Sequence, residues 1–138
     1  MVLFIFMSFQ NVSLQGKWKL TRFEAFSKTL ASTNFLNETK EKQELMLETF
    51  DFVLANTFYE FIGDSVYFTN AGGGGVVIDK SGKWLIKKDT LFIFESGKFK
   101  THKFWIEKLS EDELELKGFI PGPSGMEKGS SMIFTKLP

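Results

Sequence analysis

The sequence predicts an all-β protein with one helix, in which eight antiparallel strands run up and down and close into a barrel. Two observations predict this fold. Short segments alternate apolar and polar residues, with turn residues between them at regular spacing. The triplet Gly-Lys-Trp opens two of these segments, at residues 16–18 and 82–84. A Gly before an inward Trp allows a tight bend and places a large plug at one end of a small barrel.

The first strand is predicted over residues 14–26. Trp18 and Leu20 lie on one face of this strand, and the Lys and Thr residues between them lie on the other. Residues 27–37 are rich in Ser, Thr and Asn, which is typical of a loop.

One helix is predicted over residues 38–56, between the first and second strands. Asn37 can cap it, because its side chain can accept a hydrogen bond from a free backbone N–H of the first turn. Apolar residues recur at steps of three and four, at Met46 or Leu47, Phe50, and Val53 or Leu54. We expect this amphipathic face to pack on the outside of the barrel or on its open end.

Seven further strands joined by turns are predicted after the helix. They occupy residues 57–62, 65–69, 82–88, 90–95, 102–109, 113–119 and 130–137. Gly63-Asp64 is typical of a hairpin turn, and residues 71–75 and 121–125 are Gly-rich loops. Consecutive hairpins at this spacing predict an up-and-down meander.

The alternation also assigns an inner face to the barrel. The candidate residues that line a ligand cavity are Tyr59, Phe61, Tyr67, Trp84, Ile86, Leu91, Ile93, Phe104, Ile106 and Leu116. The two Tyr hydroxyls would fix the polar end of a ligand. An eight-strand barrel is just wide enough to be filled by its own side chains or to hold one small ligand. With Phe at 17 positions, both a filled interior and a cavity remain open.

One predicted strand is apolar on both faces. Phe92 and Phe94 would join Leu85 and Trp105 in an apolar patch on the outside of the barrel. Such a patch needs a cover. Two explanations remain open: the helix packs over the patch, or the patch forms a homodimer interface. The apolar face of the helix also needs a partner, which favours the first explanation.

Composition argues against several function classes. The 138-residue chain has zero formal net charge, and its Lys residues alternate with acidic ones, so no nucleic-acid partner is expected. Cys is absent, which excludes disulfides and thiolate metal sites. We expect His102 on the rim or surface, without the companions of a metal site. Because the inner face shows no polar pair, we assign no catalytic residue and no cofactor, and we do not expect an enzyme.

The apolar run at residues 2–7 is too short to span a bilayer, and no other segment could cross one. The run is similar to the apolar part of a secretory signal, although no basic residue precedes it. We expect residues 1–10 to be a signal remnant and residues 11–138 to be the folded domain. This favours export to the periplasm or the outside of the cell. The alternatives are an N-terminal strand or arm and a cytoplasmic location.

The Gly16-x-Trp18 opening and the eight-strand meander carry a resemblance to a known family. Residues 59–64 (Tyr-Glu-Phe-Ile-Gly-Asp) and 103–109 (Lys-Phe-Trp-Ile-Glu-Lys-Leu) add to it. The chain resembles the lipocalins, and more closely the short bacterial lipocalin-like domains with a calycin-type barrel. The resemblance implies a barrel with one open mouth that binds a small apolar molecule, closed by Gly16 and Trp18 with Lys136 over the indole.

This resemblance and the apolar inner face together lead to an expected function. We expect a non-enzymatic protein that binds or carries a small hydrophobic molecule inside the barrel. The alternative is a filled barrel that acts as a structural or interaction module through its outer aromatic patch.

Overall fold

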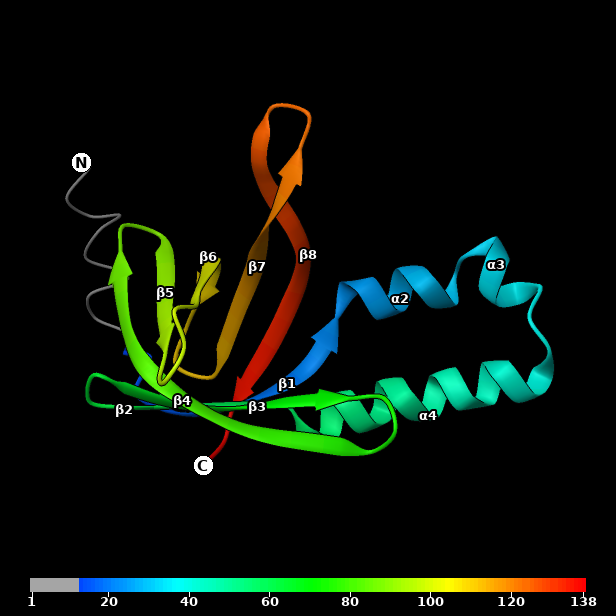
Figure 1. The fold of residues 1–138 in the computed structure, drawn as a ribbon, viewed down its shortest axis with the longest axis horizontal. Helices are drawn as coiled ribbons and strands as arrows, with labels where there is room; N and C mark the ends of the chain where they lie inside the picture. Colours follow the sequence, from blue (N-terminus) through cyan, green and yellow to red (C-terminus); the bar gives the residue numbers. More distant parts are fainter. Residues whose placement is uncertain (1–12) are drawn as a thin grey trace.

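The computed structural model describes residues 13–138, which form a closed antiparallel barrel (Figure 1). The strands are β1 (Gly16–Phe23), β2 (Phe58–Ile62), β3 (Ser65–Gly72), β4 (Val76–Lys87), β5 (Thr90–Glu95), β6 (Thr101–Leu109), β7 (Glu113–Gly122) and β8 (Gly125–Lys136). Each strand pairs with its neighbours in sequence, and β8 returns to pair with β1. The predicted eight-strand up-and-down barrel is confirmed. The predicted signal remnant at residues 1–10 lies outside the described residues.

The core of the protein lies inside this barrel. Its fully buried side chains include Trp18, Phe61 and Phe134, together with Leu and Ile residues from β5 and β7. These residues follow the two-residue period of the strands, because successive side chains point to opposite faces of a sheet. Burial of this apolar face supplies the main driving force for closing the barrel.

The tight turn between β2 and β3 sets which residues of β3 face inward. Because Ile62 pairs with Ser65 across Gly63-Asp64, Val66 and Phe68 take the inner positions. Tyr67 then points outward and is 51% exposed. The prediction that Tyr67 lines the interior is therefore wrong. A shift of one residue in register exchanges the two faces of a strand.

Three helices, rather than one, follow β1: α2 (Glu24–Leu30), α3 (Thr33–Leu36) and α4 (Lys40–Asn56). The first strand is therefore shorter than the predicted range 14–26, and most of the predicted loop at residues 27–37 is helical. The Phe26 ring lies 4.9 Å from the Phe23 ring and 4.0 Å from the Phe50 ring. This stacking joins α2 to α4. Thr39, rather than Asn37, caps α4 by accepting a hydrogen bond from the Lys42 N–H.

Helix α4 packs against β1 and β3, and Figure 1 shows the helices together on one side of the barrel. The prediction that the helix covers the outer aromatic patch is wrong, because Leu85 on β4 and Phe94 on β5 remain exposed. The chain passes from α4 through Thr57 directly into β2, which holds the helix near the strands that flank β2. Within residues 13–138, no helix has the length and hydropathy of a bilayer span.

Candidate functional site

Both Gly-Lys-Trp segments meet at the end of the barrel that carries the β2–β3 turn. The Trp18 indole N–H donates to the Leu14 carbonyl at 2.8 Å, and the Trp84 indole N–H donates to the Gly63 carbonyl at 3.0 Å. Gly16 adopts a φ of +117°, a backbone conformation that is unfavourable for residues other than Gly. The Lys136 Nζ lies 5.6 Å from the centroid of the Trp18 ring, where the resemblance placed it.

Aromatic rings from opposite walls of the barrel meet in its interior. Tyr59 on β2 lies 5.3 Å from Phe68, 5.4 Å from Phe134 and 6.4 Å from Phe104 on β6, measured between ring centroids. Burial raises the pKa of Tyr59 to about 12, so its hydroxyl stays neutral at physiological pH. These rings pack against one another inside the barrel.

Nine of the ten predicted cavity-lining residues face the interior together. Five of them are buried: Phe61, Leu91, Ile93, Ile106 and Leu116. Four pack against the core and keep part of their surface accessible: Tyr59, Trp84, Ile86 and Phe104. Tyr67 is the exception, on the outer face. That these residues contact a ligand stays a prediction.

A polar cluster shares the inner face with these residues, near the end of β5. The Glu95 side chain is 3% exposed, and its Oε1 lies 3.1 Å from His102 Nε2 and 3.2 Å from Lys80 Nζ. Lys80 pairs with the buried Phe68, and the His102 ring packs edge-on against the Phe68 ring at 5.8 Å. These contacts place the three polar side chains inside the barrel wall.

This cluster bears on two predictions. His102 was expected on the rim or the surface; it lies at the start of β6, half-buried and hydrogen-bonded to the buried Glu95 carboxylate, which agrees with the rim and not with the surface. The inner face also carries a polar pair, Glu95 and His102, which the sequence analysis did not find. Strand alternation contained the signal, since Leu91, Ile93 and Glu95 follow one another at steps of two, as do His102, Phe104 and Ile106. We had placed Glu95 and His102 outside the barrel because polar residues usually face water.

Three basic side chains surround the single carboxylate of Glu95. Lys98, in the turn after β5, places its Nζ 3.5 Å from Glu95 Oε2 and is 63% exposed. The hydrogen bond from His102, followed by the contacts with Lys80 and Lys98, lowers the pKa of Glu95 from 4.5 to about 2. Glu95 is therefore ionised at neutral pH, and the cluster carries more positive than negative charge.

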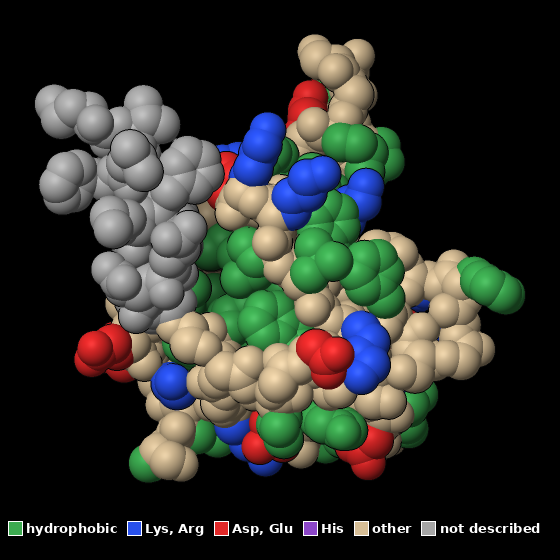
Figure 2. All heavy atoms as spheres, turned by 90° about the vertical axis from the view of Figure 1, so that its left-hand side faces the viewer, with side chains coloured by type: hydrophobic (Ala, Val, Ile, Leu, Met, Phe, Trp, Pro, Cys, Tyr) green, Lys and Arg blue, Asp and Glu red, His purple; other side chains and the backbone are tan. Residues whose placement is uncertain are grey.

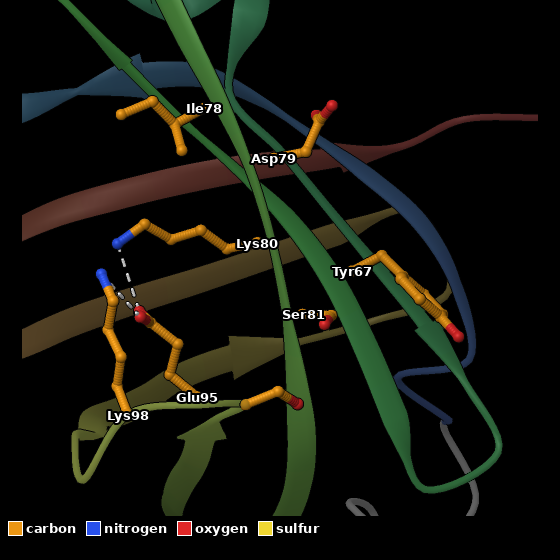
Figure 3. Close-up of a pocket in the computed structure, with 8 residues that line it drawn as sticks. Tyr67, Ile78, Asp79, Lys80, Ser81, Glu95 and Lys98 are labelled. Atoms are coloured by element: carbon orange, nitrogen blue, oxygen red, sulfur yellow. Dashed lines mark hydrogen bonds and ion pairs between the residues drawn. The ribbon is translucent and has the colours of Figure 1, made fainter.

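A pocket of about 420 Å³ opens beside this cluster, where β4 runs past the end of β5. In Figure 3 the side chains of Lys80 and Lys98 converge on the Glu95 carboxylate on one side of β4, and Ile78 lies on that side. Tyr67 and Asp79 lie on the other side of β4. The pocket therefore joins an apolar side chain to a charged group at the edge of the barrel.

The residues of this region do not form a metal centre. Among residues 13–138, no group of three or more His, Asp and Glu side chains is arranged to hold a metal ion. The cluster can donate charge-assisted hydrogen bonds to a bound molecule, because Lys ammonium groups are donors only.

Comparisons with known proteins agree with this architecture. A family model described as a lipocalin-like domain matches residues 14–116. A lipocalin-like protein from Bacteroides uniformis is similar in structure, with a TM-score of 0.55, 17% identity, and coverage of 90% of this chain and 98% of that one. An uncharacterized protein from Bacteroides eggerthii is also similar, with a TM-score of 0.53, 13% identity, and coverage of 91% and 100%. At these identities the likeness concerns the fold alone. No curated protein matches the chain.

Proposed function

The chain belongs to the lipocalin-like domain family, and from this premise we propose that it binds a small hydrophobic molecule in its barrel without transforming it. One observation carries the proposal. Tyr59, Trp84, Ile86 and Phe104 face the interior, yet part of their surface stays accessible. Apolar side chains that face a barrel interior and are incompletely covered are what a hydrophobic ligand would cover.

Accessible apolar surface also appears on the outside of the end near the β2–β3 turn. Figure 2 shows hydrophobic side chains gathered across the middle of this face, with basic side chains above them. A ligand that covers the accessible inward-facing side chains gains about 0.8 kcal/mol for each methylene group that it buries. Micromolar affinity needs about 8 kcal/mol in total, so the ligand must bury at least about ten methylene groups or an equivalent ring system.

The test is a titration with N-phenyl-1-naphthylamine, a neutral probe that fluoresces in apolar surroundings. We expect a saturable signal that 1-dodecanol displaces. Phe104→Ala should weaken probe binding several-fold, because this ring faces inward. Phe92→Ala is the matched control, since Phe92 is a half-buried Phe on the adjacent strand whose side chain points outward. Absence of a displaceable signal, or equal effects of both substitutions, contradicts the proposal.

A homodimer is a second candidate, because α4 leaves the outer patch uncovered. Leu85 is 45% exposed and Phe94 is 40% exposed. Trp105 contributes less free surface, since the Phe119 ring stacks on it at 4.6 Å and the Lys128 Nζ lies 5.2 Å from its ring centroid. The dimer would therefore centre on Leu85, Phe92 and Phe94.

Sedimentation equilibrium over a range of concentrations tests the dimer. We expect a concentration-dependent dimer that Phe94→Asp abolishes. Phe99→Asp is the control, because Phe99 is a fully exposed Phe in the β5–β6 turn, outside the patch. A monomer at every concentration rejects this candidate and leaves the binding proposal unaffected.

A further inference from the structure

We propose that the bound hydrophobic molecule carries an anionic head group, such as a carboxylate, and that Lys80 and Lys98 hold this head beside Glu95. This inference rests on the binding function proposed above and names the chemical class of its ligand. Three features of the structure carry it: the position of the cluster, its charge, and the donors that it leaves free.

The polar cluster continues the apolar lining of the barrel. His102 and Phe104 are two residues apart on β6 and share its inner face. The Phe68 ring contacts both the His102 ring, at 5.8 Å, and the Tyr59 ring, at 5.3 Å. A molecule whose apolar part lies against Phe104 and Tyr59 therefore reaches the cluster at its end. A polar head at this end matches the usual design of ligand sites, in which a few polar groups orient an apolar molecule.

The charge of the cluster favours an anion. Lys80 and Lys98 surround the single carboxylate of Glu95, which leaves one positive charge in excess when His102 is neutral. Asp79 also lines the pocket, but its side chain lies on the other side of β4 from Lys80 (Figure 3). The excess charge is partly shielded from water, because the Lys80 side chain is only 15% exposed.

The cluster also leaves hydrogen-bond donors for a second anion. The Lys80 ammonium has three N–H donors, and Glu95 Oε1 accepts from it. Lys98 lies at 3.5 Å from Glu95 Oε2 and reaches into solvent, so it can turn toward a ligand. A cationic head would instead have to compete with Lys80, Lys98 and His102 for one carboxylate.

Displacement of N-phenyl-1-naphthylamine at neutral pH tests the inference with three ligands of equal chain length. These ligands are dodecanoate, 1-dodecanol and dodecylamine, which differ in the charge of the head group. We expect dodecanoate to bind about tenfold more tightly than 1-dodecanol, which corresponds to about 1.4 kcal/mol. We expect dodecylamine to bind more weakly than 1-dodecanol.

Substitutions assign this preference to the cluster. Lys98→Met should reduce the preference for dodecanoate several-fold without disturbing the fold, because Lys98 is largely exposed. Lys80→Met should remove most of the preference, with circular dichroism to verify folding. Glu95→Gln should increase it, because the lysines then lose their competing anion. Lys87→Met is the matched control, since Lys87 is an exposed lysine at the other end of β4.

The outcomes separate this inference from the binding proposal. If all three ligands displace the probe equally, or if Lys80→Met and Lys98→Met leave the preference unchanged, the inference is wrong and the binding function stands. A preference for dodecylamine that Glu95→Gln abolishes also overturns it, because Glu95 would then be the recognition group. If the probe does not bind at all, the proposed function itself fails.

Discussion

Gly82 on β4 pairs with Glu95 on β5, and the β5 backbone leaves no room for a side chain there. A Cβ atom at this position would lie 2.9 Å from the Phe94 carbonyl carbon and closer still to the carbonyl oxygen. Both are backbone atoms, so rotation of a side chain cannot relieve the overlap. We therefore expect Gly82→Ala to push β4 and β5 apart and to lower the free energy of unfolding.

The size of this effect follows from two opposing contributions. Overpacking of a well-packed interior costs about 1–3 kcal/mol. Ala is favoured over Gly inside a strand by about 0.5–1 kcal/mol, because Gly loses more conformational freedom on folding. Since the contact is with backbone, we take the upper part of the first range and expect a net loss of about 2 kcal/mol. For a chain of 138 residues, this loss lowers Tm by about 7 °C.

Thermal unfolding followed by circular dichroism measures this change, and Gly118→Ala is the matched control. Gly118 also lies within a strand and pairs with Phe104 on β6. A Cβ atom at Gly118 would meet no atom within 4 Å. We expect Gly118→Ala to leave Tm unchanged or to raise it slightly. A Tm for Gly82→Ala within about 2 °C of the parent, or equal losses in both variants, would refute the steric reasoning.

Three further predictions concern the carboxylate cluster, the closed end and the barrel interior. Because the pKa of Glu95 is lowered from 4.5 to about 2 in the folded protein, its ionised form stabilises the fold above pH 4.5, and this stabilisation is lost as the pH falls toward 2. The stability difference between the parent and Glu95→Gln, measured by urea unfolding, should therefore shrink across this pH window. Lys136→Met should cost about 0.5–1 kcal/mol, and a double-mutant cycle with Trp18→Phe should assign part of it to the cation over the indole. Phe134→Ala should cost about 3–5 kcal/mol in urea unfolding, because it empties a fully buried position beside the Tyr59 ring, and a loss below 1 kcal/mol would contradict the packing described here.

Strand alternation predicted most of the inner face, and its failures have identifiable causes. Leu91, Ile93 and Ile106 are buried as expected, although the strand of Leu91 and Ile93 also carries Phe92 and Phe94 on its other face. On the third strand we assigned Tyr67 to the inner face, although Tyr67 shares its face with Ser65 and Thr69, and Val66 and Phe68 share the opposite one. Pairing across the two-residue turn resolved this choice.

The helical segment was predicted in part. Residues 40–56 form a helix inside the predicted range, because a long run without Gly or Pro shows a helical period. Helices α2 and α3 were not predicted. They are short and contain Ser, Thr and Asn residues, which are typical of loops. The sequence also did not predict which strands α4 covers. A helical stripe shows that an apolar face needs a partner but does not identify the partner.

The sequence by itself determined the closed barrel, the helix before the second strand and the inward position of Trp18, because these depend on the local period of apolar residues and on glycines at bends. Only the tertiary structure decided that Glu95, His102 and Lys80 converge. Glu95 and His102 stand near strand ends, where a charged residue ordinarily faces water. Their convergence depends on pairing among β4, β5 and β6, which brings together residues distant in sequence and replaces water around one carboxylate with basic side chains.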